Sequence, residues 1–153
     1  MRNDTIIRSI RYILDVDDAQ ITEITKLGGY KASRDEMSII FDENEEKDCS
    51  HELLAHFLDG LIYYKRGKSK DHPQPPIQVP VTNNMILKKL RVAFKLREED
   101  LHEILKSVDF PVSRPELSAL FRKKNHKNFR ESGDQLLRYF LQGLTKRERK
   151  DTA

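Results

Sequence analysis

Two histidines, His51 and His56, stand in the stretch HELLAH and come closest to a metal-binding motif in this chain. Zinc proteases place two histidines four residues apart on one helix, so that both imidazoles reach the same metal from one face. Here the two histidines are five residues apart and point to different faces of a helix. We therefore expect no metal at this stretch, and we interpret His51 as part of a solvent-facing helix start.

The sequence also gives little support for a catalytic nucleophile or for a phosphate-binding loop. Cys49 is the single cysteine of the chain, which excludes an internal disulfide. The carboxylates of Glu46, Asp48 and Glu52 beside it disfavour the thiolate that nucleophilic chemistry needs. Neither a G-x-x-x-x-G-K-S/T loop nor a G-x-G-x-x-G stretch occurs. We therefore expect no catalytic residues, no metal and no cofactor, and an enzyme is the minority hypothesis.

Charged residues are distributed unevenly along the chain. Residues 1–67 hold 9 Lys and Arg against 14 Asp and Glu, whereas residues 83–153 hold 17 against 10, within a total charge of +3. The contrast is sharpest between FDENEEKD at 41–48 and FRKKNHKN at 121–128. This asymmetry indicates contacts directed by charge, either between the two halves or with separate partners.

The two charged stretches occupy the same place in an internal duplication. After a three-residue insertion, LLAHFLDGL at 53–61 also overlays LLRYFLQGL at 136–144. A period of about 80 residues exceeds that of the common solenoid repeats, so the pattern predicts two related domains. A shift of 80 residues superposes ten identities: Asn3, Ile6, Arg11, Ile24, Lys26, Ser33, Arg34, Glu36, Ser38 and Phe41 fall on Asn83, Ile86, Arg91, Ile104, Lys106, Ser113, Arg114, Glu116, Ser118 and Phe121.

The predicted organisation has four parts. Residues 1–67 form an acidic first repeat, and residues 83–147 form a basic second repeat. Residues 68–82 contain four of the six prolines and form an extended linker, because proline lacks a backbone donor and interrupts helices. Residues 148–153 form a tail with almost nothing to bury, and we expect it to be frayed.

Each repeat shows the apolar spacing of about four helices, which predicts an all-α fold. The third helix of each repeat begins with a capping box, SRDE at 33–36 or SRPE at 113–116, and SGDQ at 132–135 suggests a similar cap for the last helix. Gly28-Gly29 marks the end of the second helix in the first repeat. Gly60 and Gly143 recur inside the fourth helices, where they predict the close approach of another helix.

Four segments resemble the YehS-like bacterial proteins, a tandem-repeat family whose domain has no assigned function. The resemblance covers the whole chain and implies a cytoplasmic protein made of two related helical units. It implies no reaction and supplies no catalytic residue. The segments are NDTIIRSIRYIL at 3–14, FLDGLIYYKRGK at 57–68, ILKKLRVAF at 86–94 and HKNFRESGDQLLRYFLQGL at 126–144.

The last of these segments supplies the candidate binding surface. Arg130, Asp134 and Arg138 fall four residues apart, so they would share one helix face, with Asp134 and Arg138 as an ion pair. Cations at the end of the third helix would complement its dipole, a role for which FDENEEKD has the wrong sign. The candidate binding residues are His126, Arg130, Asp134, Arg138, Arg122, Lys123 and Lys124.

Arg11 and Arg91 are identities of the repeat, and each lies four residues after an apolar position. A partly buried arginine generally needs a carboxylate partner. We therefore favour internal salt bridges to Glu36 and Glu116, which also recur, over a ligand-binding role.

We expect a non-enzymatic interaction module in which the acidic and basic repeats pair within a chain or between chains. Its partner would be a protein, either another copy in a homo-oligomer or a different chain. The competing interpretation is a nucleic-acid-binding protein that uses the second repeat, whose second and third helices resemble a helix-turn-helix. The turns GGYKAS and DFPVS are longer than the usual three or four residues of that motif.

The remaining expectations concern the membrane and the compartment. No run of about 18 apolar residues occurs, so we expect no membrane partner. The start, MRNDTIIRSIRY, is too interrupted by charge to be a secretory signal. Cytoplasmic localisation is the expectation that follows.

Overall fold

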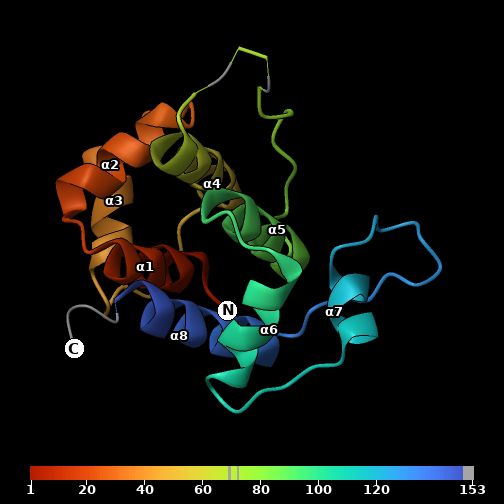
Figure 1. Cartoon of the computed structure of the whole chain (residues 1–153). Coiled ribbons are helices and arrows are strands. Elements are labelled where there is room, and N and C mark those ends of the chain that lie inside the picture. The colour runs from red at the N-terminus through yellow and green to blue at the C-terminus, as the bar shows by residue number, and fades with distance from the viewer. Residues whose placement is uncertain (69, 72, 150–153) are drawn as a thin grey trace. The chain divides into compact units, whose positions relative to one another are not determined.

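The computed structural model describes residues 1–68, 70–71 and 73–149. Within these residues the chain forms eight α-helices and no strand, which confirms the expected all-α class (Figure 1). The expected linker, residues 68–82, contains no helix in its described part. Most of the expected frayed tail lies outside the described residues, and its first residue, Glu148, still belongs to the last helix.

The chain divides into two compact units between Val81 and Thr82. Each unit contains four helices, as the duplication predicts. The first unit contains α1 (Asn3–Leu14), α2 (Asp18–Leu27), α3 (Arg34–Phe41) and α4 (His51–Arg66). The second contains α5 (Asn83–Ala93), α6 (Glu98–Lys106), α7 (Arg114–Leu120) and α8 (Asp134–Glu148).

Local sequence explains most of the helix starts. Ser33 and Ser113 form the predicted capping boxes, in which the serine hydroxyl accepts from the N–H of the glutamate three residues on and the glutamate accepts from the serine N–H. The predicted cap at Ser132 is wrong. Helix α8 starts after Gly133 without a side-chain cap, and the Ser132 hydroxyl donates to the Gly133 carbonyl instead.

Each unit buries a core of its own. In the first unit, α1 packs against α3 and α4, and Ile7 and Ile10 of α1 and Phe57 of α4 are fully buried. In the second unit, Leu90 of α5 and Phe140 of α8 are similarly buried. The repeated apolar stripes therefore become two separate cores.

The repeated glycines bring two helices of each unit into backbone contact. A Cβ built on Gly60 of α4 would lie 1.9 Å from the carbonyl oxygen of Ile24 in α2. A Cβ built on Gly143 of α8 would lie 2.3 Å from the carbonyl oxygen of Ile104 in α6. Since Ile24 and Ile104 are also repeat partners, the predicted close approach is confirmed in both units.

Equivalent turns use the left-handed conformation. Gly29 follows α2 with a φ of 99°, as predicted, and Asp109 takes the same place after α6 with a φ of 56°. Asp15 and Lys95 end the first helix of each repeat at φ values of 56° and 53°. A lysine side chain disfavours the left-handed conformation, so Lys95 adopts the backbone conformation of its repeat partner Asp15 at a cost in free energy.

Candidate interaction surface

The loop between α3 and α4, residues 42–48, is the acidic loop. The guanidinium of Arg2 donates hydrogen bonds to the carbonyl oxygens of Glu45, Glu46 and Lys47, at 3.1, 3.0 and 2.9 Å. Its Nε and Nη2 also donate to the two oxygens of Asp4, each at 3.0 Å. Arg2 therefore fastens the backbone of the acidic loop to the start of α1, and the glutamate side chains are not needed for that contact.

Asp48 closes the same loop by capping a neighbouring helix. Its carboxylate accepts from the N–H groups of Asn3 and Asp4, both at 2.8 Å, where the dipole of α1 favours a negative charge. Asp42 accepts from the N–H of Asn44 at 3.0 Å, as in an Asx turn. FDENEEKD, whose sign is wrong for the end of the third helix, thus has local structural roles through Asp42 and Asp48. Glu43 and Glu46 remain exposed in the loop.

The loop between α7 and α8, residues 121–132, is the basic loop. Asn84 holds both of its ends, because its Nδ2 donates to the carbonyls of Leu120 and Arg130 at 2.9 and 2.8 Å and its Oδ1 accepts from the N–H of Ser132 at 2.8 Å. Asn83 adds a bond from Nδ2 to the Ser132 carbonyl at 3.1 Å. This bond repeats the one from Asn3 to the Cys49 carbonyl at 3.0 Å in the first unit.

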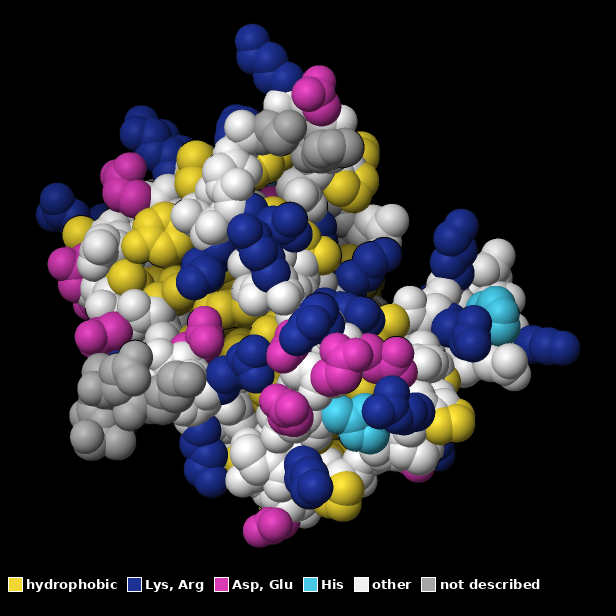
Figure 2. Space-filling view, viewed as in Figure 1, with side chains coloured by type: hydrophobic (Ala, Val, Ile, Leu, Met, Phe, Trp, Pro, Cys, Tyr) yellow, Lys and Arg dark blue, Asp and Glu magenta, His cyan; other side chains and the backbone are white. Residues whose placement is uncertain are grey.

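The interior of the basic loop is a series of turns around His126. The backbone N–H of His126 donates to the carbonyl of Lys123 at 2.9 Å, and its Nδ1 accepts from the N–H of Asn128 at 2.9 Å. The imidazole of His126 therefore stabilises one of the turns in the basic loop. Figure 2 shows Lys and Arg side chains projecting from the segment that follows α7. The exposed cations of this segment are Arg122, Lys123, Lys124, Lys127 and Arg130.

Two expectations about these cations are wrong. Helix α7 ends at Leu120 and has no basic residue in its last turn, so Arg122, Lys123 and Lys124 do not belong to the end of the helix. Arg130 lies in the basic loop and does not share a helix face with Asp134 and Arg138, which are in α8. Because α8 begins only after Gly133, a spacing of four carries no helical meaning for Arg130.

The other candidate residues have separate positions. Asp134 is the first residue of α8 and accepts from Nδ2 of Asn83 at 2.8 Å. Arg138 is exposed one turn further along. Nη1 of Arg130 lies 3.7 Å from Oε2 of Glu116. Arg130 and His126 thus belong to one loop, and Glu116 lies beside Arg130.

The expected salt bridge of Arg11 forms with Asp18 and not with Glu36, Glu116 pairs with Arg130 and not with Arg91, and both arginines contact an aromatic ring. The guanidinium carbon of Arg11 lies 5.8 Å from the ring centroid of Phe41, and that of Arg91 lies 4.9 Å from the centroid of Phe121. Both are within the range of a cation–π interaction. Nε of Arg11 lies 3.0 Å from Asp18, whereas Nε of Arg91 donates to the Leu96 carbonyl at 3.2 Å.

The two units contain equivalent aromatic stacks, which differ in whether a tyrosine hydroxyl is present to bond the nearby glutamate. Tyr30 stacks on His56 at 5.6 Å between centroids, and Phe110 stacks on Tyr139 at 5.0 Å. The hydroxyl of Tyr30 donates to Glu36, a bond that raises the pKa of Tyr30 to about 12.

The glutamates of the two units are therefore used differently. The backbone N–H of Ser33, followed by the hydroxyl of Tyr30, lowers the pKa of Glu36. Phe110 has no hydroxyl, and Glu116 is left to Arg130 of the basic loop. The hydroxyl and the backbone N–H of Ser113 are the main causes that lower the pKa of Glu116.

The titratable groups offer little to support catalysis. Burial, followed by the charges of Asp48 and Asp4, raises the pKa of the Cys49 thiol to about 12, so this thiol stays protonated at neutral pH. Among the described residues, no group of three or more His, Cys, Asp or Glu side chains is placed to hold a metal. In the same part of the chain, no helix is both long and apolar enough to cross a membrane.

Comparison with known proteins relates both units to one family. The sequence model of the family described as "Protein of unknown function (DUF1456)" matches residues 3–67 and again residues 83–150. The chain belongs to this family. It is 42% identical over 151 residues to "Uncharacterized protein YehS" of Escherichia coli strain K12, across 97% of each chain. No solved structure matches.

The two family segments coincide with the two four-helix units. The first segment contains α1 to α4, and the second contains α5 to α8. The family domain is therefore one four-helix repeat, and this chain carries it twice. The family description names no reaction or ligand.

Proposed function

We propose that the protein is a non-enzymatic interaction module in which the acidic loop and the basic loop recognise one another, between chains or within a chain. The observation that carries this proposal is the opposite charge of two loops that occupy equivalent places in the two units. The acidic loop exposes Glu43 and Glu46, and the basic loop exposes Lys123, Lys124 and Lys127.

The anchoring of both loops supports a binding role. Arg2 holds the acidic loop through backbone carbonyls, and Asn84 holds the basic loop in the same way. The anchoring bonds of Arg2 and Asn84 therefore do not use the side chains of Glu43, Glu46, Lys123, Lys124 or Lys127. A loop that is already ordered loses less conformational entropy when it binds, which leaves more of the interaction energy for affinity.

The expected affinity is modest and depends strongly on salt. Each exposed ion pair contributes about 0.2–1 kcal/mol, so several pairs must act together. Added salt screens exposed charges, because the Debye length falls from about 10 Å at 0.1 M salt to about 3 Å at 1 M. Association between chains should therefore be visible at low salt and disappear as the ionic strength rises.

Sedimentation equilibrium of the full chain between about 20 mM and about 500 mM salt tests the form between chains. The variant Lys123→Glu with Lys124→Glu should stay monomeric at low salt, and so should Glu43→Lys with Glu46→Lys. The two variants mixed together should associate again. A matched control, Lys88→Glu with Lys106→Glu, changes the same charge at exposed positions of the second unit outside the loop.

Pairing within a chain predicts a different result. The protein would then be monomeric at all salt concentrations, each reversal would lower its stability, and the combination of both reversals in one chain would restore it. If the wild type stays monomeric at low salt and neither reversal changes stability, the proposal fails.

Nucleic-acid binding by the second unit is the competing function, and the exposed cations of the basic loop favour it. The connection between α6 and α7, residues 107–113, is longer than the turn of a helix-turn-helix motif. Phosphate contacts are strongest at low salt, so titration of the full chain with duplex and single-stranded DNA and RNA at about 50 mM salt is decisive. Flat binding curves would remove this alternative.

A further inference from the structure

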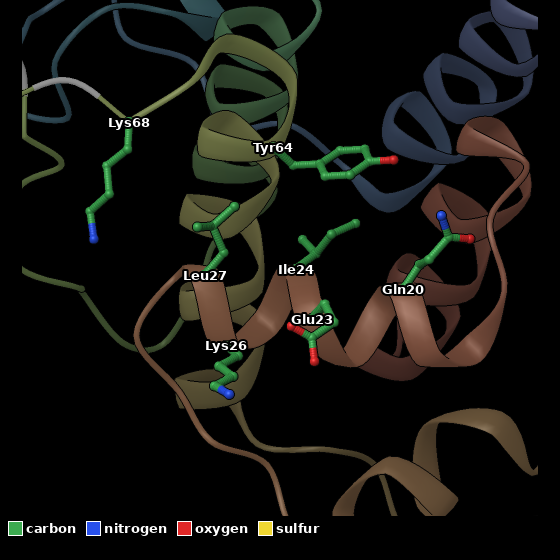
Figure 3. Close-up of a pocket in the computed structure, with 7 residues that line it drawn as sticks. All are labelled: Gln20, Glu23, Ile24, Lys26, Leu27, Tyr64 and Lys68. Carbon is green, nitrogen blue, oxygen red and sulfur yellow. The ribbon is translucent and has the colours of Figure 1, made fainter.

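A surface groove of about 440 Å³ runs between α2 and α4 of the first unit (Figure 3). Ile24 and Leu27 of α2 and Tyr64 of α4 form its apolar lining. Leu27 is 37% exposed and Tyr64 is 46% exposed, which places both among the few large apolar side chains that remain open to solvent. The volume lies within the range of small-molecule sites.

The second unit provides an internal comparison, because an ion pair bridges the same two helices there. The repeat aligns Gln20 with Asp100 and Tyr64 with Arg147. Nη2 of Arg147 lies 2.9 Å from Oδ1 of Asp100, and its Nη1 lies 3.8 Å from Oε2 of Glu103. An ion-paired arginine thus bridges α8 and α6 at the place where the first unit exposes a tyrosine.

The difference extends to the end of the helix. Leu27 aligns with Ser107, whose carbonyl accepts from Nζ of Lys146 at 3.1 Å. The fold can therefore cover this helix pair with polar side chains, and the open apolar groove is a property of the first unit's own residues. Exposed apolar surface costs free energy in water, which argues that the groove has an occupant.

The charges at the rim of the groove indicate the chemistry of that occupant. Lys26 of α2 and Lys68, just after α4, line the groove with exposed ammonium groups. Nζ of Lys68 also lies 5.3 Å from the ring centroid of Tyr63, within the range of a cation–π interaction. Glu23 and Gln20 lie on earlier turns of α2, so an acidic group is attracted to the lysines and repelled by Glu23.

We propose that this groove binds a small amphipathic carboxylic acid. Its aliphatic or aromatic body lies against Ile24, Leu27 and Tyr64, and its carboxylate pairs with Lys26 and Lys68. None of the groove's lining residues belongs to the acidic loop or the basic loop, so this proposal does not rest on the function proposed above.

Octanoate is a suitable probe, with 1-octanol as its uncharged counterpart. Titration of the full chain, followed by 1H–15N chemical-shift changes, should map octanoate to residues 20–27 and 64–68. Octanol should bind at the same place about tenfold more weakly, because it lacks the carboxylate. Shift changes centred elsewhere, or equal binding of the two probes, would overturn the proposal.

Two variants test the groove directly. Gln20→Asp combined with Leu27→Ser and Tyr64→Arg installs the residues of the second unit and should abolish octanoate binding, with helix content checked by circular dichroism. Lys26→Gln combined with Lys68→Gln keeps the apolar lining, and it should weaken octanoate binding about tenfold while leaving octanol binding unchanged. Octanoate binding that survives both variants refutes the assignment.

Discussion

Replacement of Gly60, in the middle of α4, by alanine should destabilise the first unit. The new Cβ would lie 1.9 Å from the carbonyl oxygen of Ile24 and 2.9 Å from the backbone nitrogen of Gly28. An ordinary van der Waals contact needs about 3.5 Å or more, so α2 and α4 must separate. The atoms in the way belong to the backbone and cannot rotate aside.

The magnitude follows from two opposing effects. Forcing an additional group into a packed contact costs about 1–3 kcal/mol, and a clash with a helix backbone lies at the upper end of that range. Alanine recovers about 1 kcal/mol of helix propensity relative to glycine. We expect a net loss of about 2 kcal/mol for Gly60→Ala. The loss should be smaller for Gly143→Ala, where the nearest oxygen would be 2.3 Å away and one of the close atoms belongs to the side chain of Ile104.

Urea unfolding followed by circular dichroism, with amide exchange in α2 and α4, measures this effect. Gly133→Ala is the matched control, because it adds the same methyl group where no atom lies within 4 Å. Its small cost at a helix N-cap is offset by lower entropy of the unfolded chain, so little change is expected. If Gly60→Ala and Gly133→Ala have the same stability, the backbone contact between α2 and α4 does not have the role described above.

Three further predictions concern single residues. Asn84→Ala should cost about 1–3 kcal/mol and remove amide protection from residues 121–132, because the three hydrogen bonds that hold the ends of the basic loop are lost; unchanged protection would contradict this. Lys95→Gly should stabilise the second unit by about 0.5–1 kcal/mol in urea unfolding, because its φ of 53° suits glycine, and a loss of stability would show that the lysine side chain contributes there. Tyr30 should ionise at about pH 12 in the folded protein, since loss of its proton breaks the bond to Glu36. Because this pKa is raised by folding, the stabilisation is present below about pH 10 and is lost as the pH rises toward 12. Absorbance at alkaline pH should therefore show one late tyrosine that is missing in Tyr30→Phe, and a titration identical in both proteins would refute the assignment.

The internal duplication made several features predictable from the sequence. The capping boxes at Ser33 and Ser113 depend on residues three apart, and such local bonds form as soon as the helix does. Gly60 and Gly143 were informative because each recurs in a strongly apolar helix, where glycine is costly without a packing reason. The all-α class follows from the same local patterns.

The errors arose where a residue had several candidate partners. Arg11 and Arg91 recur together with Glu36 and Glu116, and also with Phe41 and Phe121. Recurrence alone does not say whether the carboxylate or the ring is within reach. For Arg130, the spacing of four to Asp134 suggested a helix that begins only after Gly133. The signal for the true anchors, Arg2 and Asn84, is absent from any local pattern, because their bonds join residues more than 30 positions apart.

The sequence by itself determined the helical class, the two repeats and the signs of their charges. The class follows from spacings within one or two helical turns, the repeats from identities in register 80 residues apart, and the charges from composition. Only the tertiary structure decided which groups hold the two loops and which helix pair is open. Arg147 of α8 is bridged to α6 because Asp100 lies within 2.9 Å, whereas α2 and α4 leave Leu27 and Tyr64 exposed. The physical reason is that such contacts depend on how two helices pack, and this packing sets the distances between residues that are far apart along the chain.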